Sequence, residues 1–446
     1  MTDKIPGFSR ETFARRRRRL MEEMGDGILI LPAAPLLFRS RDTAHRYRPD
    51  SDLFYLTGCT EPEVVAVFGG GQEPEKPEDA FVLFVPDRDP RVELWTGPRM
   101  APQEARERFG AMAAHPLKEL GARLPALLKE PRKVICRLGI HPELDGMVLE
   151  AMREARTRGA RKGDGPRAVA DPGELLGPLR MRKDAQELAA IRQAADLTVA
   201  GFRAAMAEVH EGMGEWEVES VLEATFRRGG GSGPAFPTIV GAGANACVLH
   251  YAANGDRIPE GGLVLLDGGA EKDLYAGDVT RTFPAGGSFR GSQEEVYRVV
   301  LEAHRAAIAE IRPGNPVSGV HEAATTTLVR GLTALGILSG REEDLVRGRA
   351  WEPYFPHQTS HWLGLDVHDV GDYARRGIPT LLEPGMVLTV EPGLYFNPER
   401  TEIPEAFRGI GIRIEDDMVV TEDGAENLTE ALPTSPEGVA GLVGTG

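Results

Sequence analysis

Pro259-Glu-Gly-Gly-Leu-Val-Leu-Leu-Asp267 joins a glycine-containing turn to an apolar run that ends in a carboxylate. The same pattern returns later in the chain as Leu382-Glu-Pro-Gly-Met-Val-Leu-Thr-Val-Glu391. Short apolar runs bounded by such turns are typical of buried strands. In each copy a second strand-like segment with an acid follows, at Asp278 and at Glu415. This internal echo predicts a duplicated half-domain in which neighbouring strands carry acids.

The acids of this repeated pattern are flanked by apolar residues in the sequence. Asp267 closes the run 263–266, Glu391 closes 386–390, and Glu415 follows Ile414. Asp and Glu are almost never buried unless they are paired or bind a metal. One such acid alone is equally well explained by an ion pair or by helix capping. If four converged, each pair about 4 Å apart would repel by roughly 4 kcal/mol, and two divalent cations would cancel the charge. Oxygen ligands with a single imidazole suit an ion such as Mn²⁺.

Three of the ten histidines lie close together in His357-Gln-Thr-Ser-His361-Trp-Leu-Gly-Leu-Asp-Val-His368. Their spacing would match one helix face, but Gly364 and the β-branched Val367 favour loop and strand. A lone histidine is more often packed or solvent-facing, and we expect this of His304 and His321. Beside the acids, the cluster indicates a functional site.

The length of 446 residues predicts two domains, because single cores stop growing at roughly 250 to 300 residues. Residues 157–177 turn to Arg, Gly, Pro and Asp with little periodicity, which is typical of a domain boundary. We therefore expect an N-terminal α/β domain over 1–175 and a second domain over 176–446. Strands are expected at 28–31, 64–68 and 81–85, and helices at 103–109, 117–128 and 188–209, the last with Asp184 and Glu187 as its capping pair.

Composition excludes several classes of function. A net charge of −16 argues against a nucleic-acid partner, and no apolar run reaches the ~20 residues that span a bilayer. The three cysteines are scattered and predict neither disulfides nor a thiolate metal site. The basic run 15–19 precedes acidic rather than apolar residues, so we interpret it as a helix whose arginines face water and not as a signal peptide. A cytoplasmic location is expected.

Four motifs together resemble the Xaa-Pro aminopeptidase (aminopeptidase P) family, a group of "pita-bread" peptidases that also includes prolidase and creatinase. They are His357-x-x-Ser-His361-Trp-Leu-Gly-Leu-Asp-Val-His-Asp-Val-Gly371, Glu391-Pro-Gly-Leu-Tyr395, Gly409-Ile-Gly-Ile-Arg-Ile-Glu-Asp416 and Asp267-x-Gly with Gly277-Asp-Val-Thr-Arg-Thr-Phe283. The resemblance implies an α+β pita-bread catalytic domain at the C-terminus. It also implies release of the N-terminal residue from peptides with proline in second position, by attack of a metal-bridging hydroxide.

The resemblance also implies roles for individual residues. Two divalent ions, usually manganese, would be held by Asp267, Asp278, His361, Glu391 and Glu415, with Asp278 and Glu415 bridging. The catalytic residues would be Glu391 as proton shuttle, His368 as a partner of the oxyanion, and His250 on the substrate side. Substrate would be bound by His250, His357, His368, Tyr395 and Arg413.

The N-terminal domain is expected to form a homodimer or homotetramer and to contribute to the rim of the active site, with Asp42 and Trp95 as candidates. Two rival functions stay open. Prolidase, which cleaves Xaa-Pro dipeptides, is disfavoured by Ser-His-Trp at 360–362 but permitted by Arg375 and Arg376 as a carboxylate clamp. A non-catalytic peptide-binding protein, or a metal-free hydrolase like creatinase, is disfavoured because no ligand position is missing.

Overall fold

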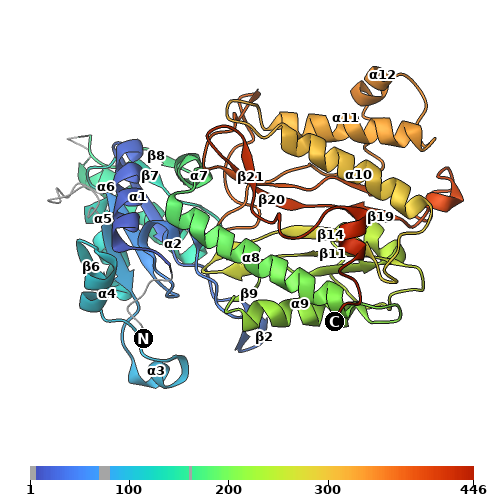
Figure 1. Ribbon diagram of the computed structural model, residues 1–446. Coiled ribbons are helices and arrows are strands. Elements are labelled where there is room, and N and C mark those ends of the chain that lie inside the picture. Colours follow the sequence, from blue (N-terminus) through green and yellow to red (C-terminus); the bar gives the residue numbers. More distant parts are fainter. Residues whose placement is uncertain (1–6, 70–80, 160–162) are drawn as a thin grey trace. The chain divides into compact units, whose positions relative to one another are not determined.

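Helices and strands alternate along both halves of the chain in the computed structural model, which describes residues 7–69, 81–159 and 163–446 (Figure 1). The chain divides into two units, Met1–Arg180 and Met181–Gly446. The division lies a few residues after the boundary that composition predicted. No helix in the described ranges is both long and apolar enough to cross a membrane.

The N-terminal unit is built on a mixed sheet in the order β6-β5-β4-β1-β7-β8. Its central strands β1, β4 and β5 are antiparallel neighbours, while β6, β7 and β8 each run parallel to the strand beside them. The strands are β1 (Gly27–Pro32), β4 (Val65–Gly69), β5 (Phe81–Val85), β6 (Ala113–Pro116), β7 (Lys133–Ile135) and β8 (Ala168–Ala170), with a separate hairpin of β2 (Phe38–Ser40) and β3 (Thr43–Ala44). The α/β class expected from the sequence is confirmed.

The helices of this unit flank the sheet. They are α1 (Arg10–Met24), α2 (Ser51–Thr57), α3 (Pro90–Thr96), α4 (Pro102–Phe109), α5 (Leu120–Leu127), α6 (Pro142–Gly159) and α7 (Gly173–Met181). Leu124 of α5 and Val148 of α6 pack with Ile28, Val67 and Phe84 of the central strands in one buried cluster. The strands and helices predicted at 28–31, 64–68, 81–85, 103–109 and 117–128 correspond to β1, β4, β5, α4 and α5 with the short 3₁₀ turn before it.

The basic run in α1 differs from its prediction. Arg16 and Arg17 are each only 2% exposed. Arg16 donates to the Tyr55 carbonyl at 3.1 Å and its guanidinium lies 4.3 Å from the centre of the Tyr55 ring, while Arg17 donates to the Leu56 carbonyl at 2.9 Å. A guanidinium can be buried in this way because it is planar, weakly hydrated and able to stack on rings. The expectation that these arginines face water is therefore wrong for Arg16 and Arg17.

Short sheets form the centre of the C-terminal unit. β11 (Leu263–Gly268) lies between β10 (Ile239–Ala242) and β14 (Val279–Pro284), and β20 (Asp416–Val420) lies between β17 (Val387–Val390) and β21 (Ala425–Asn427). β18 (Gly393–Tyr395) pairs with β19 (Gly411–Arg413). A bridge between Thr280 and Glu415 connects the first group of strands to the second. Smaller sheets comprise β9 (Gly233–Pro234), β12 (Ala270–Lys272) and β13 (Tyr275–Ala276), and β15 (Ala374–Arg375) with β16 (Ile378–Pro379).

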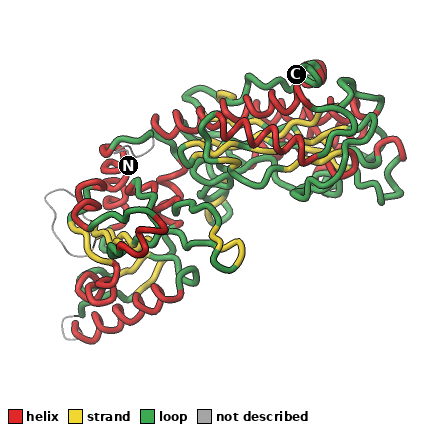
Figure 2. Tube along the Cα trace, turned by 90° about the horizontal axis from the view of Figure 1, so that it is seen from below, coloured by secondary structure: helices red, strands yellow, loops and turns green. Residues whose placement is uncertain are grey.

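Helix pairs enclose these strands. In Figure 1 the strands lie between two helix pairs, one formed by α8 (Ala185–Glu208) and α9 (Glu215–Arg228), the other by α10 (Ser292–Ala309) and α11 (Ser318–Ala334). In Figure 2, which shows the molecule from below, long helices lie over the strands. The remaining helices are α12 (Glu342–Arg347) and α13 (Pro436–Ala440). The capping pair predicted for α8 is present, since the Asp184 carboxylate accepts from the Gln186 and Glu187 amides. The unit has the pita-bread fold expected from the resemblance.

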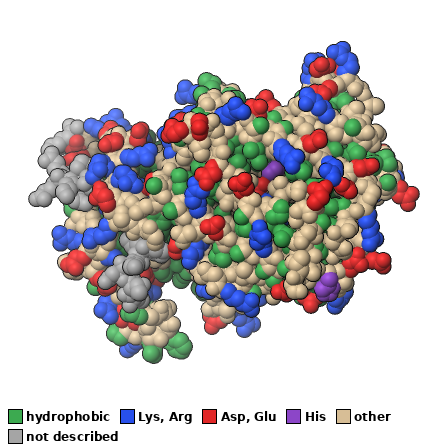
Figure 3. All heavy atoms as spheres, viewed as in Figure 1, with side chains coloured by type: hydrophobic (Ala, Val, Ile, Leu, Met, Phe, Trp, Pro, Cys, Tyr) green, Lys and Arg blue, Asp and Glu red, His purple; other side chains and the backbone are tan. Residues whose placement is uncertain are grey.

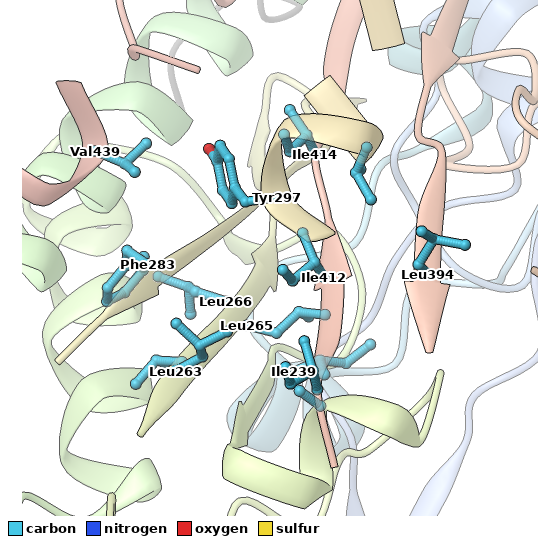
Figure 4. Packing of buried hydrophobic residues seen from close by; sticks show 14 of the residues in the cluster. Ile239, Leu263, Leu265, Leu266, Phe283, Tyr297, Leu394, Ile412, Ile414 and Val439 are labelled. Carbon is cyan, nitrogen blue, oxygen red and sulfur yellow. The ribbon is translucent and has the colours of Figure 1, made fainter. Parts of the chain in front are cut away.

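Helices cover the strands on both sides, which leaves even the polar Thr280, Arg281 and Thr282 of β14 buried. Every residue of β11 and of β14 is buried, as expected for strands with no face in water. Figure 4 shows Leu265 and Leu266 of β11 packed with Ile412 and Phe283 from neighbouring strands. Acids in such strands are confined to the ends. Charged side chains of both signs are interspersed on the surface seen in Figure 3.

One buried ion pair ties the strands to the C-terminal segment. Arg281 of β14 is fully buried and donates to the Asp416 carboxylate at 2.7 Å, to the Leu432 carbonyl at 2.8 Å and to the Glu415 carbonyl at 2.6 Å. Removing one partner of a buried pair leaves the other charge uncompensated. This contact therefore fixes the main chain at Glu415.

We expect Arg281→Met to lower the free energy of unfolding by about 3–5 kcal/mol, because Asp416 would keep its charge without its partner. Urea titration followed by circular dichroism measures the change. Arg298→Met is the matched control, since Arg298 contacts Glu294 and Glu437 on an exposed surface, and it should leave the transition in place. Equal midpoints for both variants would contradict the prediction.

Candidate functional site

A cavity of about 980 Å³ opens at the strand ends of the C-terminal unit. All five predicted metal ligands line it, namely Asp267, Asp278, His361, Glu391 and Glu415. His250, His357, His368 and Arg413 line it too. The structure thus brings together residues from segments that are distant in the sequence.

Strand geometry explains how the acids meet. Asp267 lies near the end of β11, opposite Thr280 of β14, and Asp278 immediately precedes β14. Glu391 follows β17, and Glu415 lies between β19 and β20. Because Thr280 bridges to Glu415, the acids of both halves reach the same end of the cavity.

Three of these residues form the tightest group. Ligand atoms of Asp278, His361 and Glu415 all lie within 4.8 Å of one another. His361 Nε2 is 3.3 Å from Asp278 Oδ2 and 3.6 Å from Glu391 Oε1. The distances are short enough for shared cations and are unfavourable for bare carboxylates.

Unused acceptors provide a test of whether cations fit here. Asp267 Oδ1 and Asp278 Oδ1 are buried and have no hydrogen-bond partner among the described residues. Buried polar atoms are rarely left unpaired, and such exceptions often mark the place of an ion. A hard divalent cation is the partner that carboxylate oxygens prefer. The donor set therefore fits divalent metal.

The electrostatics of the acids point the same way. Burial raises the pKa of Asp278 and Glu415 well above the usual range, and the neighbouring carboxylates raise each pKa further. Burial also raises the pKa of Glu391, although the charges of His361 and Arg413 oppose that rise. Each shift reflects the cost of gathering negative charge in a site shielded from water. Cations at the same place would favour the ionised forms instead.

His361 has the orientation that a ligand needs. Its Nδ1 lies 3.1 Å from the Trp362 carbonyl oxygen, so a proton on Nδ1 completes a hydrogen bond. The lone pair of Nε2 is then directed towards Asp278 and Glu391. Metal-binding histidines are commonly fixed through their other ring nitrogen in this way.

A hydrogen-bonded chain connects the acids to His357. Arg413 donates to Asp267 Oδ2 at 2.5 Å and to the Tyr395 hydroxyl at 2.8 Å, and that oxygen lies 2.8 Å from His357 Nε2. Arg413 is only 4% exposed and Tyr395 5%. Both were predicted to bind substrate, yet in this structure their polar groups hold Asp267 and His357. Burial and the Arg413 charge lower the pKa of His357 to about 3, so its ring is neutral near pH 7.

The other two predicted histidines are exposed at the cavity. The His368 ring is edge-on to that of His361, with the ring centres 4.4 Å apart. Burial and the nearby His361 lower the pKa of His368. His250 lies on the segment after β10, beside Leu249 and Ala252. Both rings are therefore accessible to a molecule in the cavity.

Two residues of the site escaped the sequence analysis. His321 of α11, expected to be an ordinary packed or solvent-facing histidine, lines the cavity with its Nδ1 2.9 Å from the Thr359 hydroxyl. Burial lowers its pKa to about 4, together with the Arg349 charge. Thr280 donates to Glu415 Oε2 at 2.6 Å and accepts from Arg413 Nε at 3.0 Å. The period-two spacing of Asp278 and Thr280 was the available signal for Thr280.

The N-terminal candidates lie on the other unit. Trp95 is 87% exposed on α3, and Asp42 is exposed between β2 and β3. Within the N-terminal unit neither is part of a described cavity.

Comparison with known proteins agrees with this geometry. Residues 189–422 match the family described as metallopeptidase family M24, and residues 13–136 match the aminopeptidase P N-terminal domain. The chain is 40% identical to Xaa-Pro aminopeptidase of Escherichia coli, over 98% of both chains. It is 33% identical to human Xaa-Pro aminopeptidase 3, covering 96% of this chain and 85% of the human one.

Solved structures show the same likeness. An aminopeptidase of Pseudomonas aeruginosa superposes with a TM-score of 0.92 at 40% identity, over 98% of each chain. A zinc-substituted aminopeptidase P of Escherichia coli in complex with product gives a TM-score of 0.91 at 40% identity, again over 98% of each chain.

Removal of the Thr280 hydroxyl should weaken metal binding. Thr280→Val keeps the shape of the side chain but leaves Glu415 Oε2 and Arg413 Nε without their shared partner, and losses at such supporting positions typically cost about 10–100-fold in metal affinity. Competition with a fluorescent chelator measures the affinity. Thr327→Val, which removes a hydroxyl bonded only to the Ala323 carbonyl of its own helix, should not change it. Unchanged affinity in Thr280→Val would refute the supporting role.

Proposed function

The chain belongs to metallopeptidase family M24, and we propose that it releases the N-terminal residue from peptides with proline in the second position, using two manganese ions. It is a metal-dependent aminopeptidase, and its substrates are peptides. The observation that carries the proposal is the convergence of Asp278, His361 and Glu415 beside unpaired carboxylate oxygens. The identity of the metal and the presence of two ions rest on the donor set, which is four carboxylates and one imidazole.

The five residues would divide the coordination between two ions. Asp278 and Glu415 are the most deeply buried of the four acids and would be shared between the ions, while Asp267, His361 and Glu391 would complete the ligand set. When bound, divalent cations supply a water-derived nucleophile at neutral pH and polarise a carbonyl group. The remaining chemistry falls to the side chains.

Glu391 is the proposed proton carrier. A proline nitrogen in a peptide bond has no hydrogen, so it must gain a proton when that bond breaks. Glu391 Oε1 is 3.6 Å from His361 Nε2 and its Oε2 is 3.4 Å from His357 Nδ1, which places the carboxylate between the ligand group and the substrate side. From this position the carboxylate can accept a proton and return it.

The histidines are proposed to hold the substrate. His368 is close to His361 and exposed, so its ring can donate to the oxygen that gains charge in the transition state. His250, exposed on its segment, is proposed to contact the substrate. His357, kept neutral and bonded to Tyr395, is proposed to contact the proline end of the peptide. Arg413 is proposed to act there through Tyr395 and Asp267.

Assembly and location complete the proposal. A homodimer or homotetramer would bury the exposed Trp95 and Leu94 of the N-terminal unit, and the N-terminal unit would contribute to the rim of an active site. A cytoplasmic location stays a prediction from the sequence.

Substitution of the two neighbouring histidines should separate metal binding from catalysis. His361→Ala should lose metal, whereas His368→Ala should keep it and lose mainly rate, by about 100-fold or more for a group that assists in the transition state. Inductively coupled plasma mass spectrometry after gel filtration counts the ions per chain. A full complement of metal in His361→Ala would show that the ligand assignment is wrong.

A matched substrate pair tests peptide length. We expect a clear preference in kcat/KM for Ala-Pro-Ala over Ala-Pro, because the free carboxylate of a dipeptide needs a cation and an unpaired buried charge costs several kcal/mol. Arg375 and Arg376 lie exposed on the β15–β16 hairpin, whose Tyr373, Ala374 and Pro379 line the cavity. Preference for the dipeptide would indicate a prolidase instead, with one of these arginines as the clamp.

A further inference from the structure

Glu215, the first residue of α9, is a fully buried carboxylate outside the metal ligand group. Its Oε1 accepts from the Ala242 amide at 2.8 Å and from the Asn245 side-chain amide at 3.0 Å. Its Oε2 accepts from the Tyr251 hydroxyl at 3.0 Å and from the Asp256 amide at 2.8 Å. All four donors are uncharged. Such a set offsets much of the cost of burying a carboxylate, and it does so only while every donor stays in place.

The four donors belong to one stretch of chain. Residues 242–256 leave β10, pass through a 3₁₀ turn (Gly243–Cys247) and return as turns and irregular chain. Leu249, His250 and Ala252 of this stretch line the cavity. Glu215 therefore binds the backbone at both ends of the stretch and two side chains within it, those of Asn245 and Tyr251. His250 lies between these two residues in the sequence.

A second clamp holds the same stretch to β10. Asn254 is 3% exposed and adopts a φ of +43°, a left-handed conformation that asparagine tolerates. Its Oδ1 accepts from the Val240 amide and its Nδ2 donates to the Thr238 carbonyl, each at 2.9 Å. Beyond Ala242, which still pairs with β11, no residue of the stretch has a strand partner among the described residues, so side chains fix its course.

The stretch also touches the strand that carries Arg413. A Cβ on Gly411 of β19 would lie only 2.2 Å from the Ala246 carbonyl oxygen. The 3₁₀ turn thus packs directly against β19, and the contact at Gly411 is two residues from Arg413. A shift of this turn would displace His250 relative to the residues around the metal ligands.

We propose that Glu215 is a positioning residue for the peptidase reaction, which holds residues 242–256 so that His250 faces the substrate. The inference rests on the substrate-binding role proposed for His250. Glu215 touches neither substrate nor metal ligand and acts through the chain that it binds. Its helix is already capped, because Glu217 accepts from the Gly214 amide at 2.7 Å, so helix capping does not account for a buried carboxylate with four donors.

The test compares Glu215→Gln with Glu217→Gln in the full-length, metal-loaded protein. A glutamine at 215 turns an NH₂ group towards two donors, whereas a glutamine at 217 still fits a capping box. Hydrogen exchange by mass spectrometry should show roughly tenfold faster exchange in peptides from 243–256 of Glu215→Gln, the effect of losing one hydrogen bond to a charged group. Peptides from β11 and β14 should not change, nor should any peptide of Glu217→Gln. Unchanged exchange at 243–256 overturns the proposal.

Kinetics then separate positioning from general stability. Glu215→Gln should lower kcat/KM for Ala-Pro-Ala roughly tenfold in the wild-type background and less than about twofold in a His250→Ala background, because residues acting through one group are not additive. Equal factors in both backgrounds, or faster exchange with unchanged kcat/KM, overturn the positioning role. If His250→Ala alone leaves kcat/KM unchanged, the role proposed for His250 fails, and with it the positioning role, while the exchange result still reports whether Glu215 holds the stretch. Should Glu215→Gln fail to fold, Tyr251→Phe removes one of the four donors to Glu215, together with the long contact from the Gly255 amide, and serves in the same measurements.

Discussion

Mutual repulsion among buried carboxylates is the constraint around which the C-terminal unit is arranged. Asp267, Asp278, Glu391 and Glu415 share one cavity, and burial together with their like charges raises the pKa of the last three. A protein gains nothing in stability from such a cluster, since an apolar core of the same volume would be favoured. The cluster is tolerable because it lies at strand ends, where the backbone is already bonded and the apolar interior begins immediately behind it. Divalent cations convert the repulsion into coordination, which is why the fold and the metal site cannot be separated.

Two buried arginines, Arg413 and Arg281, fix the positions of acids in and next to this cluster. Arg413 contacts Asp267 from one side and Tyr395 from the other, and Arg281 binds Asp416 and the carbonyl of Glu415. Each guanidinium also binds backbone or hydroxyl groups, Arg281 the Leu432 carbonyl and Arg413 the Tyr395 hydroxyl. Thr280, between Glu415 and Arg413, transmits the position of one to the other. These contacts hold Asp267 and Glu415 in position, and preorganisation of this kind reduces the rearrangement that coordination requires.

The sequence predicted the fold class and the acids well, because both depend on local patterns. Apolar runs with a terminal acid predicted β11 and β17, and Gly364 with Val367 favoured loop and strand over helix through the histidine cluster. The failures have a common cause. Arg16, Arg17 and His321 were assigned from their own helices, yet their surroundings come from α2, β5 and the segment around Thr359. Thr280 and Glu215 contact residues far away in sequence, and no period in the chain indicates such partners. Charge and periodicity show which residues are unusual, but only the tertiary structure shows which partners satisfy them.

A division of labour follows between strands and irregular chain. The acids lie on or beside buried strands, whereas His250 and His368 lie in turns and irregular chain. Each of these segments is fastened by a buried charged group instead. Glu215 binds the stretch around His250, and Lys183 donates to Asp369, the neighbour of His368, at 2.9 Å with both side chains almost fully buried. The four proposed acid ligands lie on or next to buried strands, whose backbone is fixed, while the proposed substrate-binding residues His250 and His368 are exposed at the cavity. Glu215 and Lys183 fix these segments from outside the cavity and leave the cavity open. Because a buried charge is unfavourable without its hydrogen-bond partners, each segment is restricted to conformations that keep those partners in place.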